Sequence, residues 1–377
     1  GGTLSLQSSL SRLDQFNYDL QTYNTVPLIL NYTQPIRAYN ALKWRKKTAP
    51  LQYENAQRAY LETMQDITIN VTNLFFTVLS AQENYRQSVA DYEDRKHLFE
   101  IAKKRLDLGT TTKSEVLQME LSLLNAKMSV NSTSLTLRTQ LFSLFSYLRI
   151  VDYGDIELLP PYYMPEIEMN AEQVLDKAWT GSSHSIEQQL NLLESQRALA
   201  EAKANRGLQV EFRGRLGLSQ SANELPAAYR RLKDYETVGL TMTIPIYDWG
   251  MGRGKVRMAK TDVEITKTQI EQANIEFAHD VRTKVMQFNN QAEQCKTSLR
   301  AQDIAAERYD IMKKRFENGS VTVTELNTAQ EEFESAQHQY ISQLQQFWTD
   351  YYGIQKLTLY DFIRKENIGV NFNDLVN

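Results

Sequence analysis

Residues that break regular structure are scarce in this chain, which has only 15 glycines and 8 prolines in 377 residues. This scarcity favours a few long helices and strands over many short ones. The single cysteine, Cys295, excludes an intramolecular disulfide framework, and no Cys and His residues are spaced as metal ligands. The net charge of -4 offers no basic field, so nucleic acid is not an expected partner.

Long apolar runs are also missing. No stretch of eighteen apolar residues occurs, so the sequence predicts no membrane-spanning helix. The first ten residues, GGTLSLQSSL, lack the basic and apolar regions of a signal peptide. We therefore expect either a cytoplasmic protein or a mature or trimmed form that crossed the inner membrane earlier.

Strict alternation of apolar and polar residues marks the segment 237–246, TVGLTMTIPI. Alternation with period two predicts a strand with one apolar face. Shorter or equally clear alternation occurs at residues 208–219, 3–12 and 25–35. In the last of these, Val26 is expected on the same face as Leu28, Leu30 and Tyr32. The sequence thus predicts four strands of about ten residues.

Two long helical hairpins are predicted, over residues 40–150 and 251–362. In the first, apolar positions recur at spacings of four and three, as in helices packed along other helices. Gly109 ends the first helix as a left-handed cap residue would. The segment from Thr112 to Glu115 has the pattern of a capping box, which starts the next helix. We expect mainly α structure with a small antiparallel β part.

An internal duplication with an offset of 210 residues relates the two halves, as Gly109 and Gly319 illustrate. The same offset relates Pro35 to Pro245, Lys103 to Lys313, Glu115 to Glu325 and Ala126 to Ala336. It also relates two sets of predicted packing positions, which are Val71, Phe75, Val78, Gln82, Tyr85 and Val89, and Val281, Val285, Phe288, Ala292, Cys295 and Leu299. Cys295 is therefore expected to be packed rather than reactive.

The duplication suggests a domain organisation of two strand-strand-helix-helix repeats. The predicted segments are a first repeat (1–150), a linker with equatorial helices (151–206), a second repeat (207–362) and a C-terminal tail (363–377). Within them, a helix capped by Asn170 and another from Ser185 to about Ala204 are expected.

Strands of this length with one apolar face fit a β-barrel in a membrane. Four strands cannot close a barrel, and open edges are not tolerated in lipid, so the barrel must be shared among chains. A helix over residues 251–318 would extend on the order of 100 Å and would project away from the membrane. Aromatic residues flank the strands as at a membrane interface, namely Phe16, Tyr18, Tyr23, Tyr229 and Tyr235 at one end and Tyr39, Trp44, Tyr247 and Trp249 at the other.

These features together resemble the TolC-type family of outer-membrane efflux proteins. The resemblance is carried by LTMTIPIYDWGMGRGKVRMAK, by RYDIMKKRFENGSVTVTELNTAQEEFESAQHQY and by the weaker counterpart KKRLDLGTTTKSEVLQMELSLLNAKMSV. It implies a homotrimer with a 12-stranded barrel in the lipid of the outer membrane and a long α-helical barrel in the periplasm. It also implies a periplasmic adaptor, or membrane fusion protein, linked to an inner-membrane transporter that supplies the energy.

Two departures from the family are visible. Family members have a helix before the first strand, whereas this sequence opens at the strand, so we expect a cut or processed chain. The Tyr and Arg that form a latch in some relatives correspond to Phe316 and Val321 here. A closing mechanism, if there is one, would therefore differ from theirs.

The turns between paired helices are the candidate docking site for the adaptor. They comprise Gly109, Thr110, Thr111, Thr112, Gly319, Ser320, Val321 and Thr322. Their composition is equally that of ordinary cap glycines followed by capping boxes. Glu115 and Glu325 correspond to acidic residues near the periplasmic aperture of the family, although capping alone would explain both.

No catalytic site is predicted, and neither is a cofactor. The glycines of WGMGRGK at residues 249–255 fit neither phosphate-binding pattern. The four histidines lie far apart in the sequence without a nucleophile or carboxylate at motif spacing. The predicted function is an outer-membrane exit duct for efflux or type I secretion, and the alternative is a periplasmic adaptor or a coiled-coil structural tether.

Overall fold

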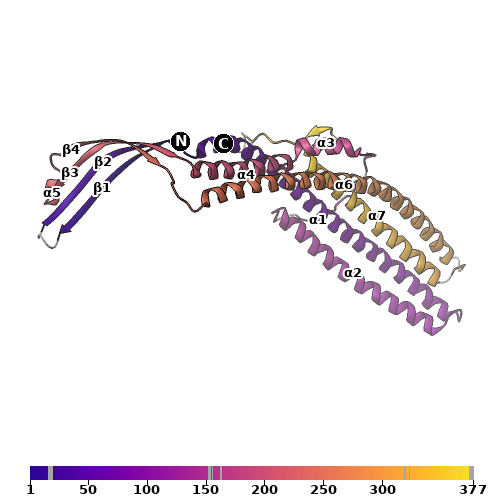
Figure 1. The fold of residues 1–377 in the computed structure, drawn as a ribbon. Helices are drawn as coiled ribbons and strands as arrows, with labels where there is room; N and C mark the ends of the chain where they lie inside the picture. Colours follow the sequence, from indigo (N-terminus) through magenta and orange to yellow (C-terminus); the bar gives the residue numbers. More distant parts are fainter. Residues whose placement is uncertain are drawn as a thin grey trace. The chain divides into compact units, whose positions relative to one another are not determined.

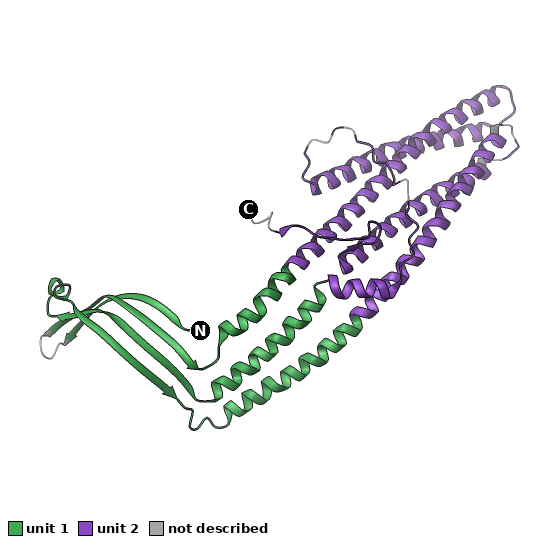
Figure 2. Ribbon diagram, turned by 90° about the horizontal axis from the view of Figure 1, so that it is seen from above, with its two compact units in different colours: residues 1–56, 183–276 green, residues 57–182, 277–377 purple. Residues whose placement is uncertain are grey.

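The chain is described by a computed structural model. It describes residues 1–15, 20–151, 154, 156–161, 164–317, 320–321 and 323–372. Two compact units are present, shown in different colours in Figure 2. Unit 1 comprises residues 1–56 and 183–276, and unit 2 comprises residues 57–182 and 277–377. Each unit therefore combines segments from both halves of the sequence.

Unit 1 contains one antiparallel sheet of four strands in the order β1-β2-β3-β4, which lie side by side in Figure 1. The strands are β1 (Thr3–Gln15), β2 (Leu20–Arg37), β3 (Gln209–Ala222) and β4 (Lys233–Thr243). The central pairing, β2 with β3, joins the two repeats. Phe16 and Tyr18 lie outside the described residues.

The strand expected to end at Ile246 ends at Thr243 and begins earlier, at Lys233. The prediction of its end was wrong because alternation says nothing about the partner strand. Gln209, the first residue of β3, pairs with Thr243, so no neighbour remains for residues 244–246. Pro245 also has no N–H to donate to a ladder.

One face of the sheet is apolar and uncovered by the rest of the described chain. Leu30 pairs with Leu216, and Phe212 pairs with Leu240, so these side chains share a face. Exposed side chains on this face include Leu4 (66%), Leu6 (66%), Val238 (74%), Leu240 (54%) and Met242 (61%). The opposite face carries Glu211, Arg213 and Arg215, with Arg213 bonded to Glu211 at 2.8 Å.

The alternation expected from Val26 to Tyr32 is interrupted. The register of β2 against β3 shifts between Thr25 and Leu28, so a bulge lies at Pro27. A proline cannot donate to the ladder and is found in sheets at edges or bulges. The prediction that Val26 shares a regular face with Leu28 was therefore wrong.

The helices follow the predicted order. They are α1 (Ala41–Asp107), α2 (Lys113–Tyr147), α3 (Ala171–Gly181), α4 (His184–Arg206), the one-turn α5 (Leu225–Ala228), α6 (Met251–Glu317) and α7 (Val323–Thr358). Helices α1 and α6 each have 67 residues. Asn170 caps α3 as predicted, since its Oδ1 accepts N–H groups of Glu172 and Gln173.

The main core of unit 2 lies where α3 packs on α6 and α7. Its members include Val174, Leu175, Ala178, Val281, Val285, Phe288, Phe347, Tyr351 and Ile354. The ring of Phe288 is fully buried, with its centroid 5.1 Å from that of Phe347. A Cβ at Gly181 would lie 2.0 Å from the backbone oxygen of Thr358, so only glycine permits this close approach.

The predicted packing positions are buried near this core but not along the whole hairpin. Cys295 is 1% exposed and packs among Phe76, Leu79, Ile341 and Leu344. Val89 and Leu299, by contrast, are 37% and 42% exposed, so the prediction failed there. Beside Val89, Ser88 occupies the interface and meets Thr133 through a 2.7 Å hydrogen bond. Polar contacts thus replace apolar packing toward the turns.

The C-terminal segment is fastened to the core. Two short strands, β5 (Tyr360–Asp361) and β6 (Glu366–Asn367), pair with each other. The hydroxyl of Tyr351 donates to Asp361 at 2.7 Å and accepts the N–H of Ile363 at 3.1 Å. Among the described residues no helix is apolar over a length that could cross a bilayer.

The packing makes Phe288 a sensitive position. We expect Phe288→Ala to destabilise the protein by about 3–5 kcal/mol because it leaves a cavity among α3, α6 and α7. Met286→Ala, on the same helix but 63% exposed, should cost less than about 1 kcal/mol. Thermal unfolding followed by circular dichroism compares the two, and equal losses would contradict this account of the core.

Burial raises the pKa of the Cys295 thiol to about 11. At pH 8 the folded protein should therefore resist maleimide, whereas the unfolded chain, with a thiol pKa of about 8.5, should react fully. Because the unfolded state ionises first, stability should fall as the pH rises from about 8.5 towards 11. The single cysteine makes the labelling stoichiometry, read by mass spectrometry, unambiguous; rapid native labelling would show that the thiol is accessible.

Candidate functional site at the hairpin turns

The turn between α1 and α2 is closed by backbone hydrogen bonds around Gly109. Its φ of +70° is the left-handed conformation that glycine adopts without strain. The Gly109 N–H donates to the Leu106 oxygen and the Thr110 N–H donates to the Arg105 oxygen, both at 2.9 Å. This is the paired bonding of a Schellman motif, so the predicted cap is present.

The capping box predicted at the start of α2 is also present. The Thr112 Oγ1 accepts the N–H of Glu115 at 3.3 Å, and the Glu115 carboxylate accepts the N–H of Thr112 at 3.3 Å. The Thr111 hydroxyl donates to the same carboxylate. Glu115 therefore already has three polar contacts that fix the turn.

The turn between α6 and α7 repeats part of this geometry. The Ser320 N–H donates to the Arg315 oxygen at 2.9 Å, 210 positions after the equivalent bond from Thr110 to Arg105. Ser320 is exposed and Val321 is half-buried. Gly319 and Thr322 lie outside the described residues. Glu325 is exposed in the first turn of α7.

One residue of the first turn was missed by sequence reasoning. Leu108 precedes the cap glycine and is 77% exposed, although it is a large apolar side chain. An apolar residue at the end of a helix is expected to pack inward, and only the structure shows it uncovered. Together with the hydroxyl groups of Thr110 and Thr112, it gives the turn a surface of mixed polarity.

The two hairpins meet through polar side chains of α1 that contact α6 and α7. The Asp94 carboxylate accepts the Lys313 ammonium at 2.9 Å and the Tyr309 hydroxyl at 3.4 Å. The contacts between α1 and α7 pair Asp66 with Lys356, Asn73 with Gln345 and Thr349, Glu83 with Gln337, and Asp91 with Gln330. Burial, with the Asp94 charge, raises the pKa of Tyr309 above its usual range. These contacts join the two hairpins.

Sequence reasoning also missed an exposed apolar stripe on α2. Helix α2 exposes large apolar side chains at spacings of three, four and seven residues, namely Leu117, Leu121, Leu124, Met128, Leu135 and Phe142. Their exposures range from 54% for Leu117 to 68% for Leu135. Such a stripe is typical of a helix that packs against another helix.

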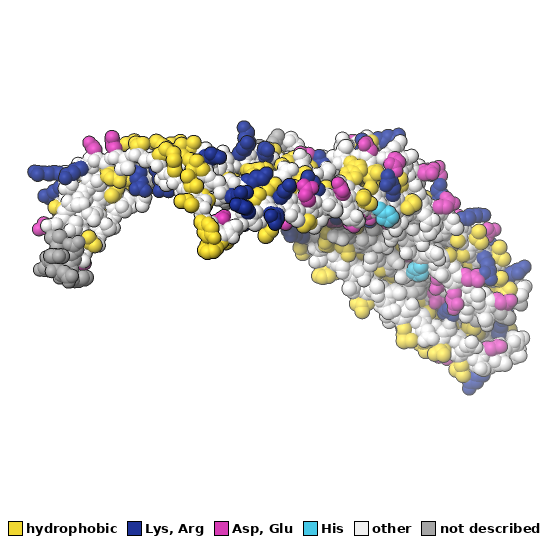
Figure 3. Space-filling model, viewed as in Figure 1, with side chains coloured by type: hydrophobic (Ala, Val, Ile, Leu, Met, Phe, Trp, Pro, Cys, Tyr) yellow, Lys and Arg dark blue, Asp and Glu magenta, His cyan; other side chains and the backbone are white. Residues whose placement is uncertain are grey.

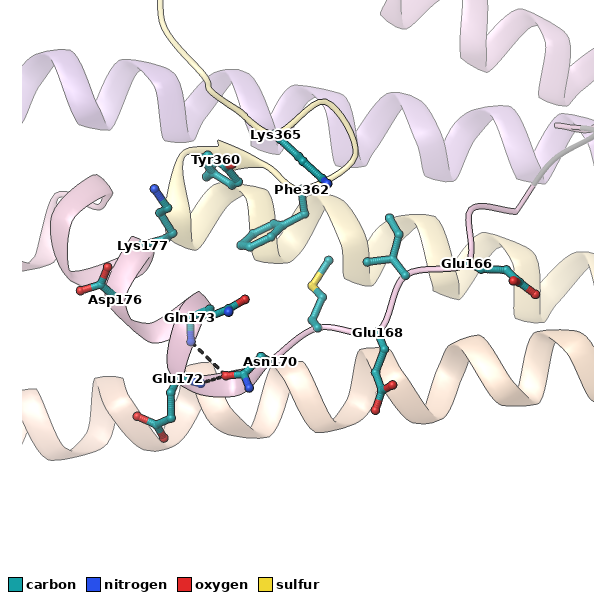
Figure 4. Close-up of a pocket in the computed structure, with 12 residues that line it drawn as sticks. Glu166, Glu168, Asn170, Glu172, Gln173, Asp176, Lys177, Tyr360, Phe362 and Lys365 are labelled. Atoms are coloured by element: carbon teal, nitrogen blue, oxygen red, sulfur yellow. Dashed lines mark hydrogen bonds between the residues drawn. The ribbon is translucent and has the colours of Figure 1, made fainter.

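A cavity of about 750 Å³ lies between α3 and the C-terminal segment (Figure 4). Its lining includes the carboxylates of Glu166, Glu168, Glu172 and Asp176 and the rings of Tyr360 and Phe362. Glu172 pairs with Arg282 and Glu166 with Lys296, and the Lys177 ammonium lies 4.5 Å from the Tyr360 ring centroid. Glu166, Glu172 and Lys177 already have partners, and we assign no ligand to this cavity. Within the described ranges no group of His, Cys, Asp and Glu could hold a metal ion.

The described fold combines an open four-stranded sheet with two long helical hairpins. The sequence model of the family described as "outer membrane efflux protein" matches residues 1–148 and 182–358. The chain belongs to this family. It is an outer-membrane efflux duct that extends into the periplasm, and the adaptor and tether alternatives are set aside.

Solved structures of low sequence identity share the fold. The Campylobacter jejuni CmeC outer membrane channel aligns with a TM-score of 0.77 at 14% identity, over 100% of this chain and 80% of that one. The Vibrio cholerae outer membrane protein VceC gives 0.70 at 14% identity, over 95% and 86%. The open state of the Neisseria gonorrhoeae MtrE outer membrane channel gives 0.73 at 13% identity, over 94% and 80%. No curated protein sequence matches the chain significantly.

The conformation of Gly109 predicts a local cost of substitution. Gly109→Ala meets no neighbouring atom within 4 Å, so its cost is the left-handed backbone alone, about 1–2 kcal/mol. Gly254→Ala, which also meets nothing but lies within α6, should instead stabilise by about 0.5–1 kcal/mol. Hydrogen exchange of the Thr110 amide measures the effect of Gly109→Ala, which should reduce the protection of this amide. Unchanged protection would contradict the strain expected in the cap.

Proposed function

We propose that three copies of the chain close a 12-stranded barrel, each supplying its four strands. The support is the state of the single sheet, in which β1 and β4 are edge strands and one face is apolar and uncovered. Unpaired backbone groups at such edges each cost several kcal/mol in lipid, so isolated sheets do not span membranes. Pairing of β4 in one copy with β1 in the next removes all edges.

The helices of the three copies would form the periplasmic wall in the same way. The uncovered α2 stripe needs a partner helix, and α6 also exposes apolar residues at Met286, Ile304 and Ile311, which lie within the reach of α2 from the turns. Contact between α2 of one copy and α6 of the next would bury both sets at about 25 cal/mol per Å². The homotrimer therefore completes sheet and helices together.

The duct is a passive conduit, with energy supplied by an inner-membrane transporter through a periplasmic adaptor. The adaptor docks on the turns, where Leu108, Thr110 and Thr112 are exposed together with Ser320. Gly109, Thr111, Gly319, Val321 and Thr322 complete the docking turns. No catalytic step is required of the chain.

Glu115 and Glu325 are the candidates for the periplasmic aperture. The Glu115 carboxylate is engaged by Thr111 and Thr112, and Glu325 lies in the first turn of α7. In a trimer, three copies of Glu325 would form a ring of negative charge, and such rings favour cations. The acidic ring would then set ion preference at the narrow end.

The trimer can be tested at the α2 stripe. Leu121→Glu with Leu124→Glu should convert the trimer to monomer in detergent, because carboxylates would be buried without partners. The matched control places one charge beside the stripe with Asn125→Glu, at an exposed position, and should remain trimeric. Mass photometry gives the species directly, and a trimer that survives both leucine changes would locate the interface elsewhere.

The aperture is tested by single-channel recording in planar bilayers. Glu325→Ala should lower the preference for cations over anions by roughly twofold or more. Glu331→Ala, an exposed carboxylate further along α7, is the control and should leave selectivity unchanged. Identical selectivity and gating in the Glu325 variant would remove this residue from the aperture.

A further inference from the structure

Positive charge is concentrated where the helices meet the sheet in unit 1. We call these exposed residues the junction collar, and they are Lys43, Arg45, Lys46, Lys47, Lys203, Arg206, Arg253, Lys255, Arg257 and Lys260. No Asp or Glu occurs between Arg37 and Tyr53 or between Trp249 and Thr261. Figure 3 shows Lys and Arg side chains gathered with apolar ones over this region.

The strand register brings the collar together from three helices. Arg37, the last residue of β2, pairs with Val210 at the start of β3, which follows the end of α4. Gln209 pairs with Thr243, the last residue of β4, which leads to α6. The starts of α1 and α6 and the end of α4 therefore lie at one end of the sheet.

The collar opposes the local preferences of two helices. The first turns of α1 and α6 contain no acidic residue, and Lys43 and Arg253 occupy them instead. Cations at a helix N-terminus are unfavourable because the macrodipole is positive there. The chain supplies caps of its own, since the Asp248 carboxylate accepts the N–H groups of Gly250 and Gly252 and the Asn40 Oδ1 accepts the N–H of Lys43. This one carboxylate is outnumbered by the collar cations, so an external anion is the partner that would balance them.

Exposed aromatic and apolar residues lie among these cations. Trp249 is 84% exposed with its ring centroid 4.7 Å from that of Tyr247, and Ile246 is 93% exposed. The Lys47 ammonium lies 5.0 Å from the Trp44 ring centroid. Aromatic rings interleaved with cations beside an apolar strand face are typical of the headgroup level of a membrane. A purely aqueous anion would not require the apolar part.

Helical spacing separates the collar into faces. Lys43 and Lys47, four residues apart, share one face of α1, and Arg253, Arg257 and Lys260 share one face of α6. Arg45 and Lys255 lie on other sides of the two helices. Lys43 with Lys47, and Arg253 with Arg257 and Lys260, therefore form one cationic face on each helix.

We propose that Lys43, Lys47, Arg253, Arg257 and Lys260 bind the phosphate groups of anionic glycerophospholipids in the membrane leaflet next to the helices. The orientation of this surface towards lipid rests on the proposed closed barrel. Cations beside a membrane surface attract anionic headgroups, and several together select anionic over zwitterionic lipid. The duct would thereby be anchored at a fixed depth and surrounded by a specific lipid.

Tryptophan quenching measures this selection in the full chain reconstituted in vesicles. The vesicles contain phosphatidylcholine with phosphatidylglycerol, and either lipid carries the bromine that quenches nearby tryptophan, with Trp44 and Trp249 as reporters. We expect quenching by brominated phosphatidylglycerol to exceed that by brominated phosphatidylcholine by about threefold at low salt. At about 0.5 M salt the ratio should fall towards one. A ratio of one at low salt overturns the proposal.

Three variants test whether the lipid preference depends on the charge of the collar residues, on the type of basic side chain or on the helix face. K43Q/K47Q/R253Q/R257Q/K260Q should bring the ratio to about one, because the attraction to phosphate is lost. The charge-conserving K43R/K47R/R253K/R257K/K260R should retain it. R45Q/K255Q, on the other sides of the helices, should also retain it; loss there with retention in the first variant overturns the assignment of faces.

Conductance of the same vesicles, fused to planar bilayers, separates this proposal from that of the duct. Channels that form without a lipid preference would contradict only the proposed lipid site. If no channels form, the proposed barrel, on which the lipid site depends, would be contradicted as well. K127Q/R138Q/R300Q/K314Q removes exposed charge from unit 2 and should keep the preference. Selection of lipopolysaccharide without selection of phosphatidylglycerol would overturn the proposal. If the variant with five substitutions fails to assemble, the salt dependence of the quenching ratio in the unmodified protein tests the proposal instead.

Discussion

A single copy of the four-stranded antiparallel sheet, with two free edges and an uncovered apolar face, has an unfavourable free energy both in water and in lipid. In water the apolar side chains remain exposed, and in lipid the unpaired N–H and C=O groups of β1 and β4 carry a cost of several kcal/mol each. Only closure with further strands satisfies both faces and edges. This constraint is the physical basis of the proposed barrel of three copies.

The helices meet a different requirement, since they have to hold their turns in place and still enclose an aqueous path. Where α3 packs on α6 and α7, apolar side chains such as Phe288 and Phe347 make a dry core. Towards the turns, ion pairs and amides, of which Lys313 with Asp94 is one, take over the contact between hairpins. Partly exposed polar contacts contribute about 1 kcal/mol or less each, so the turn end is the less rigid end.

The hairpin turns of unit 2 and the helix–sheet junction of unit 1 differ in the origin of their stability. The hairpin turns are built by local caps that any helical hairpin could use, so their geometry alone does not reveal docking. The junction collar, by contrast, places Lys43 and Arg253 against the dipoles of their own helices. A feature that opposes local stability carries more information about partners than one that supports it.

Local patterns were enough to predict much of this protein. Period-two alternation predicted the strands, spacings of four and three predicted the hairpins, and Thr112 with Glu115 predicted a cap that the structure contains. These follow from bonds between residues close in sequence. The bulge at Pro27, the end of β4 at Thr243 and the exposure of Leu299 were decided by partners distant in sequence. Such partners set strand register and burial, and periodicity within one segment does not contain that information.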